Sequence, residues 1–366
     1  MKKNNTKKSF LLGKLFFILA LSVLISGCKG AKDSTKSVED VRVGTQGIIL
    51  NFLPQAPPDK ILVAQGADEK LNSFDIILEL KNKGAFPQPN EGTAPDGYVV
   101  LSGYDPNILT IEAQDGSNKN WQNFGTKTLE GKSSINPNGG QDIMTFKAKV
   151  DVDALNVERY EPMFLATACY PYRTVAGPSV CIDPNPYSTV KSKKVCEVQS
   201  ISLTSQGAPI AVTRVDEEAF TTKTQFKITI KNVGGGDVLK SISDQCTLID
   251  RENIDKVYVS NVAVARKGLE CRPFVGSQSV SEQGSSGFNG YVRLVNGEGY
   301  IICELLKEHY RSNTEFTTPL TIELNYNYRN SIEKKMQIKK EITSTSGGSE
   351  ANQIAQLPSF PESTIT

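Results

Sequence analysis

The feature of this sequence that most constrains its fold is an internal repeat. CYPYRTVAGPSVCI at 169–182 aligns without gaps on NYNYRNSIEKKMQI at 325–338, at a constant spacing of 156 residues. Both tyrosines and the arginine of the first segment fall on identical residues, namely Tyr170, Tyr172 and Arg173 on Tyr326, Tyr328 and Arg329. A repeat this long indicates two copies of one domain rather than a solenoid of short units. The length of 366 residues is also what two domains require.

A second pair of matching segments predicts a strand in each copy. FDIILELKNKGAF (74–86) corresponds to FKITIKNVGGG (226–236), and each segment runs into Asn-x-Gly. In the second copy the apolar residues Phe226, Ile228 and Ile230 alternate with polar ones. A period of two with one apolar face is typical of a half-buried strand. The glycine then lets the chain turn.

The composition supports the same fold class. Gly and Pro are plentiful, with 29 and 18 residues, and Val, Ile, Thr, Tyr and Phe recur in short runs between turn signals. We therefore expect an all-β protein with two tandem antiparallel β-sandwiches of the immunoglobulin or fibronectin III type. The first should cover residues 41–188 and the second residues 195–342, with a short linker at 189–194.

The N-terminus predicts export and lipidation. Residues 1–27 open with four lysines, continue with an apolar run from Leu15 to Ile25, and end in small residues. This pattern is typical of a signal peptide. Ile-Ser-Gly-Cys at its end resembles the bacterial lipoprotein box, in which the signal is cut before the cysteine and the cysteine carries lipid. Cys28 is therefore the expected lipidation site, and residues 28–40 form a flexible tether.

Two alternatives remain for this segment: a plain signal peptide, or an uncleaved anchor with Cys28 as a bystander. The apolar run is shorter than the ~20 residues of a spanning helix. After cleavage, 36 basic residues (41 minus five) face 40 acidic ones, so the formal charge is −4. Such a balance argues against nucleic-acid binding. We expect membrane contact through lipid alone, an extracytoplasmic location, and a disordered tail at 343–366.

Six cysteines remain beyond Cys28, and an even number in an exported chain predicts disulfides: Cys169, Cys181, Cys196, Cys246, Cys271 and Cys303. Cys169 corresponds to Asn325 and Cys181 to Gln337, and both of these polar residues alternate with apolar ones. The two cysteines should therefore lie on the outer face of one hairpin that turns around Val175, and both are absent together from the other copy. Opposed residues of a hairpin are close enough for a disulfide. For the other four we expect the pairs Cys246–Cys271 and Cys196–Cys303.

No catalytic residue, metal ligand or cofactor is predicted. The only histidine, His309, lies in a charged segment. It is therefore a poor candidate for the base of a catalytic triad, and a metal site on Cys169 and Cys181 would lack its two further ligands. Trp121 is the one distinctive aromatic residue. It lies with Phe124 in a polar insertion, where an exposed ring can contact a sugar or a partner surface. The alternative is that Trp121 folds back over its own domain.

The strands that end in LKNKG and IKNVG resemble those of CARDB-type domains, the fibronectin- and immunoglobulin-like modules of prokaryotic surface proteins. The chain departs from them in its extra cysteines and in long insertions at 105–141 and 268–290. The resemblance implies a spacer or binding module with no activity of its own.

These observations predict a lipid-anchored, non-catalytic structural or adhesive module of the cell surface, with a protein or glycan partner. One alternative is an accessory subunit of an envelope or secretion complex. Another is a glycan-binding or glycan-hydrolysing protein.

Overall fold

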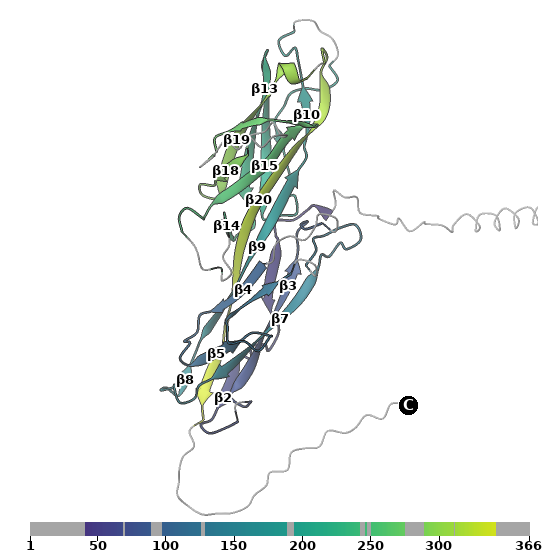
Figure 1. Ribbon diagram of the computed structural model, residues 1–366. Coiled ribbons are helices and arrows are strands. Elements are labelled where there is room, and N and C mark those ends of the chain that lie inside the picture. The colour runs from purple at the N-terminus through teal and green to yellow at the C-terminus, as the bar shows by residue number, and fades with distance from the viewer. Residues whose placement is uncertain are drawn as a thin grey trace, which may run out of the picture. The chain divides into compact units, whose positions relative to one another are not determined.

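The computed structural model of the protein describes residues 41–68, 70–88, 97–125, 129–188, 194–241, 246, 250–274, 289–310 and 312–341 (Figure 1). These residues form strands and one short 3-10 helix, η1 (Lys307–His309), which confirms the predicted all-β class. No helix among them has the length and apolar character needed to span a membrane. The predicted signal peptide, Cys28, the tether at 28–40, the tail at 343–366 and most of the linker lie outside the described residues.

One sheet belongs to the first half of the sequence alone. Its order is β1 (Ile48–Phe52), β3 (Ser73–Asn82), β7 (Gln141–Val150) and β5 (Leu109–Glu112). All three pairings are antiparallel. Strand β3 alternates as its sequence predicts, because its inward-facing apolar side chains are almost fully buried: Phe74, Ile76, Leu78 and Leu80.

The corresponding sheet of the second half has the order β11 (Ile201–Ser202), β12 (Ile210–Ala219), β13 (Lys223–Asn232), β19 (Glu298–Leu306) and β17 (Glu270–Arg272). Strand β13 confirms the second predicted strand, since Phe226, Ile228 and Ile230 are buried. The period-two pattern therefore placed both strands and their inward faces correctly.

A third sheet of nine strands is shared by both halves. Its main path runs through β16 (Lys267–Gly268), β15 (Lys256–Val264), β20 (Phe316–Lys335), β9 (Met163–Ala176), β4 (Gly97–Ser102) and β6 (Trp121–Phe124). Three more strands attach to this path: β10 (Ser179–Ile182) and β14 (Asp237–Leu239) to β20, and β18 (Gly290–Arg293) to β15. A small sheet consists of β2 (Lys60–Val63), β21 (Gln337–Lys340) and β8 (Arg159–Tyr160), with β2 parallel to β21.

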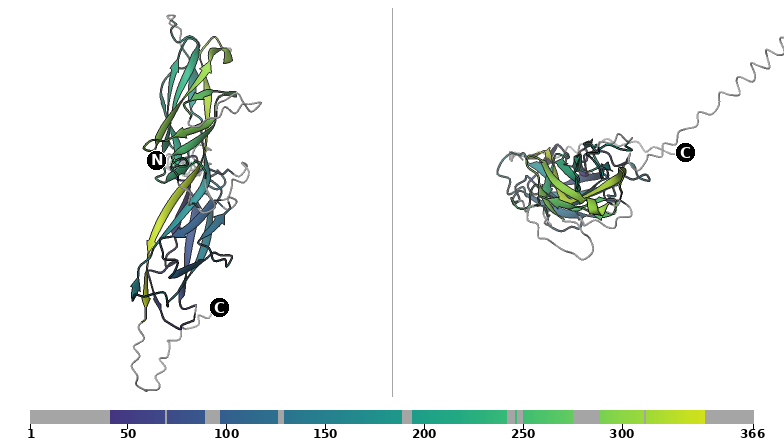
Figure 2. Two further views of the ribbon diagram at one scale, coloured as in Figure 1. Left: turned by 60° about the vertical axis from the view of Figure 1, so that its left-hand side comes forward. Right: turned by 90° about the horizontal axis from the view of Figure 1, so that it is seen from above.

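The repeated segments pair with each other at the centre of the shared sheet. Strands β9 and β20 are antiparallel over 14 residue pairs and lie side by side in the views of Figure 1 and Figure 2. The same register continues at both ends, where β10 pairs with the start of β20 and β21 pairs with β8. Pro171 lies opposite Asn327, which is also its counterpart in the repeat. The two copies are therefore related by an approximate two-fold axis through this pair.

The predicted hairpin around Val175 is wrong. Strand β9 runs straight through this residue, which lies opposite Glu323 of β20. The strand finds its partner in the other copy rather than in its own continuation. As a result β10, from the first half, joins the second half, and β21, from the end of the second half, joins the first. Strand pairing crosses the predicted linker at 189–194 in both directions.

The apolar core is continuous across both halves. One cluster of buried side chains includes Phe146 from the first half and Ile301 from the second. We call the antiparallel pair of β9 and β20 the shared ribbon. Four of its tyrosines connect the two halves of the core. The ring centroids of Tyr170 and Tyr328 are 6.1 Å apart, and those of Tyr172 and Tyr326 are 6.3 Å apart. Burial raises the pKa of each of these phenols, so they are neutral members of the core.

The same hydrogen-bonded turn follows the predicted strand in each half. In the first, Asn82 Oδ1 accepts hydrogen bonds from the Gly84 amide and the Tyr172 hydroxyl, each at 3.0 Å, and Asn82 Nδ2 donates to Phe86 O at 2.7 Å. A Cβ on Gly84 would lie 2.0 Å from the Tyr172 hydroxyl oxygen, so only glycine fits beneath the ring.

The second half repeats this turn atom for atom. Asn232 Oδ1 accepts from the Gly234 amide and the Tyr328 hydroxyl, each at 3.2 Å, and Asn232 Nδ2 donates to Gly236 O at 2.7 Å. Asn-x-Gly and the second tyrosine of Tyr-x-Tyr are thus parts of one device, which we call the Asn–Tyr lock. It ties each half's own sheet to the shared ribbon.

Candidate binding surface around the Cys169–Cys246 disulfide

All six predicted cysteines form disulfides, but their partners differ from those expected. The bonds are Cys169–Cys246, Cys181–Cys196 and Cys271–Cys303. Disulfide bonding is therefore confirmed, and the pairings Cys169–Cys181, Cys246–Cys271 and Cys196–Cys303 are wrong. Disulfides persist in oxidising compartments, so these bonds indicate an extracytoplasmic environment.

The wrong pairing of Cys169 with Cys181 has a structural cause. Because β9 does not turn back, Cys169 and Cys181 lie at different points along the ribbon, opposite Arg329 and Thr317 respectively. The cross-strand geometry expected for them occurs instead at Cys271 and Cys303, which face each other on β17 and β19 with their Cα atoms 4.0 Å apart.

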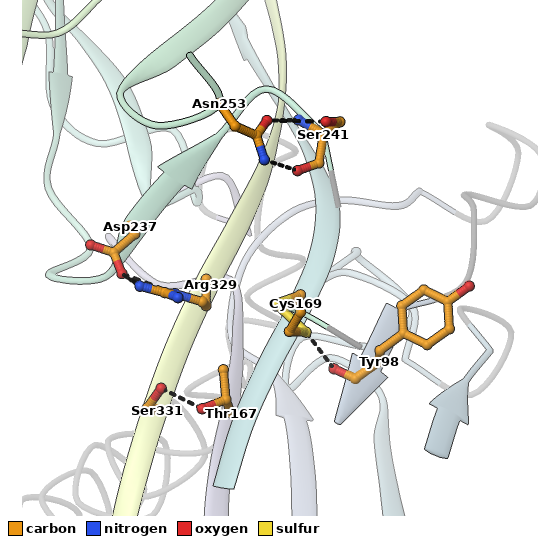
Figure 3. The surroundings of a disulfide bond; sticks show 9 residues. Tyr98, Thr167, Cys169, Asp237, Ser241, Asn253, Arg329 and Ser331 are labelled. Atoms are coloured by element: carbon orange, nitrogen blue, oxygen red, sulfur yellow. Dashed lines mark hydrogen bonds and ion pairs between the residues drawn. A yellow bond between two sulfur atoms is a disulfide. The ribbon is translucent and has the colours of Figure 1, made fainter. Parts of the chain in front are cut away.

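Cys169 lies in a row of side chains that crosses the shared sheet. Arg329 of β20 is opposite Cys169 on one side, and Tyr98 of β4 is opposite it on the other. Arg329 also forms an ion pair with Asp237 of β14, with Nε at 3.0 Å from Oδ2 (Figure 3). The row therefore changes from charged at β14 to aromatic at β4.

Trp121 lies beside the aromatic end of this row, two residues along β6 from Asn123, which is the residue opposite Tyr98. It lies on β6, at the edge of the shared sheet, opposite Val100. Its ring centroid is 6.1 Å from that of Tyr98, and Lys119 Nζ lies 4.9 Å above the ring. Trp121 and Tyr98 are half-buried against a small cluster formed by Val100, Cys169 and Cys246. We call this set, with Lys119, the disulfide plate.

The structure corrects the predicted environment of these aromatic residues. Trp121 and Phe124 lie on a sheet strand, not in a loop. Phe124 is 3 % exposed and belongs to the core, where a Cβ on Gly97 would lie 2.3 Å from its ring. Phe124 therefore offers no contact surface. Trp121 packs over its own fold, yet part of its residue surface remains accessible. It therefore combines the two predicted alternatives, which were an exposed contact residue and a residue folded back over its domain.

Cys246 lies on the segment between β14 and β15, which is closed by its own hydrogen bonds. The Ser241 amide donates to Asn253 Oδ1 at 2.7 Å, and Asn253 Nδ2 donates to Ser241 O at 2.9 Å (Figure 3). The disulfide then joins this segment, from the second half, to β9, from the first. The plate is consequently built from both halves.

Sequence reasoning missed Tyr98 and Lys119. A signal for the second was present, because Lys119 and Trp121 are two residues apart, and this spacing places side chains on one face of extended chain. Nothing in the sequence connects Tyr98 with Cys246, since that contact depends on the pairing of β4 with β9.

The described residues show other features relevant to chemistry. No group of three His, Cys, Asp or Glu side chains converges there as metal ligands would. The His309 side chain is partly exposed, with Nε2 3.8 Å from Glu308 Oε1. Asp151 Oδ1 accepts hydrogen bonds from the amides of Asp153 and Ala154 and so stabilises a turn. The plate, with a half-exposed indole, a phenol ring and a lysine, is suited to surface recognition.

No family model matches this sequence, and no curated protein is significantly similar to it.

Proposed function

We propose that this protein is an exported structural or adhesive module, held at a membrane by lipid on Cys28, which presents a recognition surface outside the cytoplasm. The observation that carries this proposal is the set of three disulfides, because thiols are kept reduced in most cytosols. The repeated strands ending in Asn-x-Gly agree with the CARDB-like class of surface module. The proposed role involves no catalysis.

The disulfide plate is the proposed contact surface. Tryptophan and tyrosine rings are enriched at recognition sites, because they bring a large contact area with little loss of conformational entropy. Trp121 and Tyr98 present such rings on a rigid sheet. Lys119 lies over the Trp121 ring and is also paired with Asp115, with Nζ 3.1 Å from Oδ2. A planar sugar face or an aromatic protein surface would match this chemistry.

Site-specific photocrosslinking in intact cells tests the contact surface. A photoreactive phenylalanine analogue at Asn123, an exposed β6 residue opposite Tyr98, should give a discrete adduct. The same analogue at Asp75, exposed on β3, is the matched control and should give none. Adducts that are equally abundant from both positions, or absent from both, would reject the plate as the contact surface.

The identity of the adduct separates the proposed module from the alternative role as a subunit of an envelope complex. One dominant protein partner would favour the subunit. Varied protein or glycan adducts would favour the free-standing adhesive module.

The lipid anchor is tested separately. Cys28→Ala should release the protein from membranes or leave it with an uncleaved signal and a higher mass. Unchanged attachment together with unchanged mass would contradict lipidation at Cys28, without bearing on the plate.

A further inference from the structure

An open cavity of about 700 Å³ lies at one end of the second half, away from the disulfide plate. It lies beside the turn between β15 and β16 and the segment that follows β19. Its apolar surface includes Val264, Leu305 and Phe316. Ligand pockets in proteins typically measure about 300–1,000 Å³ and combine an apolar lining with a few polar groups. This cavity has both properties.

Tyr310 supplies a buried aromatic side chain to this lining. It directly follows η1, and its side chain lines the cavity while only 9 % of the residue is exposed. Its buried hydroxyl interacts with the side chain of Thr224 on β13, although neither oxygen meets strict hydrogen-bond geometry. The polar atom of Tyr310 is therefore directed to the protein, and its ring contributes to the apolar lining.

The mouth of the cavity is cationic. Arg266 and Lys267 are presented by the tight turn after β15, in which Ala265 has a φ of 53°. Neither side chain forms an ion pair with any residue that the structure describes, and the lining contains no aspartate or glutamate. An anionic group at the mouth would therefore meet positive charge that no acidic side chain of the lining offsets.

We propose that this cavity binds an anionic amphiphile with one apolar chain or ring system. The apolar part would contact Val264, Leu305 and Phe316, and the anionic head would pair with Arg266 and Lys267. The Tyr310 ring would add to the apolar contacts. A neutral sugar would need more polar partners than this lining offers, and a cation would be repelled at the mouth. The site is separate from the plate and goes beyond the proposed recognition role.

Two probes with the same aromatic ring system test the charge requirement on the exported protein with its disulfides intact. The first is 8-anilinonaphthalene-1-sulfonate, an anionic aromatic amphiphile, and the second is N-phenyl-1-naphthylamine, which has the same ring system without the sulfonate. We expect saturable binding of the sulfonate, about tenfold or more tighter than binding of the amine, since one favourable ion pair can contribute on that order. Decanoate should displace it, and decanol should displace it less effectively.

Charge-reversal variants locate the site. The double variant Arg266→Glu and Lys267→Glu should weaken sulfonate binding by about tenfold or more and leave amine binding unchanged. The control, Lys60→Glu and Lys70→Glu, makes the same charge change at exposed positions of the first half and should alter neither. Circular dichroism verifies that each variant is folded.

Three results would overturn the proposal: no saturable binding of the sulfonate, equal affinity for both probes, or equal weakening by the cavity and control double variants in folded protein. None of these results depends on the plate or on the lipid anchor.

Discussion

Single side chains decide how the halves of this protein are joined. Asn82 is fully buried and satisfies four groups, since it also donates to Leu129 O at 2.8 Å. Its counterpart Asn232 is less buried and has three such partners. A buried polar group left unpaired destabilises a fold by about 1–3 kcal/mol. The two Asn–Tyr locks should therefore differ in their contribution to stability.

Asn82→Ala and Asn232→Ala form a matched pair of variants. We expect both to lower the free energy of unfolding, Asn82→Ala by about 3 kcal/mol or more and Asn232→Ala by about 1–2 kcal/mol. Urea denaturation of the oxidised protein measures both values. The comparison requires that the dependence of the unfolding free energy on urea concentration is the same for both variants. If Asn232→Ala lost as much unfolding free energy as Asn82→Ala, or more, then burial and the number of hydrogen-bond partners would not explain the contribution of these residues.

Glu217 gives the protein a pH dependence. Its Oε2 accepts a hydrogen bond from the Cys181 amide at 3.1 Å, and its Oε1 has no hydrogen-bond partner among the described residues. Burial raises the pKa of this carboxyl from 4.5 to about 7, although the Cys181 amide opposes the shift. Between these pH values the folded chain holds a proton that the unfolded chain has lost. Stability must therefore fall as pH rises through this window.

Glu217→Gln should remove this dependence. The wild type should lose on the order of 3 kcal/mol of stability between pH 4.5 and pH 7.5 through this group, and the variant should lose much less. Urea unfolding at several pH values measures the difference. Glu218→Gln, at the exposed neighbouring residue, is the control and should follow the wild type. A parallel response of all three proteins would exclude Glu217 as the source.

At the scale of elements, the sequence predicted strands and faces but not partners. Alternating side chains in β3 and β13 identified the buried face, because period two is a local property. The partner of a strand is a non-local choice, and the same alternation suits a hairpin within one copy or a ribbon between two. The repeat thus correctly predicted which residues of the two copies correspond. It led to the wrong partner for β9, which pairs with β20 and not with its own continuation in a hairpin. Both errors about Cys169 and Cys181 follow from that one choice.

Ile338→Ala tests the exchange of strands directly. Ile338 is fully buried on β21 and lies opposite Ile61 and Tyr160, both in the first half. The variant should lose about 2–5 kcal/mol. Hydrogen exchange should show faster exchange first in β2 and β8, although the altered residue lies near the end of the sequence.

The counterpart Ile182→Ala provides the matched control for this experiment. Ile182 is equally buried but lies opposite Phe316, at the start of β20. Its loss should loosen the second half first. If either variant instead loosened the half of the sequence in which it lies, the exchange of β10 and β21 would be refuted.

At the scale of the whole molecule, a shared ribbon and a continuous core couple the two halves. Two domains joined by a linker alone would unfold in separate steps, whereas a common core favours one cooperative transition. The wild-type protein should therefore unfold in a single step. Calorimetric and van't Hoff enthalpies should agree, and fluorescence of the only tryptophan, Trp121, should change together with circular dichroism. Resolved transitions from these probes would contradict coupling.

The candidate surface was only partly predictable from the sequence. Trp121 stood out as the single tryptophan, and its position on an edge strand beside Lys119 agrees with a contact role. The contribution of Tyr98 and of the Cys169–Cys246 bond depends on strands that are distant in sequence. Pairings of this kind are set by the packing of the complete chain, which local patterns do not report.

The joint between the halves is bridged twice by sulfur, at Cys181–Cys196 and at Cys169–Cys246. A protease that cleaved the backbone once between residues 182 and 195 would produce two chains still linked covalently and still intertwined through β10 and β21. Such a nicked protein would migrate as one species until a reductant and a denaturant acted together. Cleavage of the backbone between the two halves would thus separate nothing.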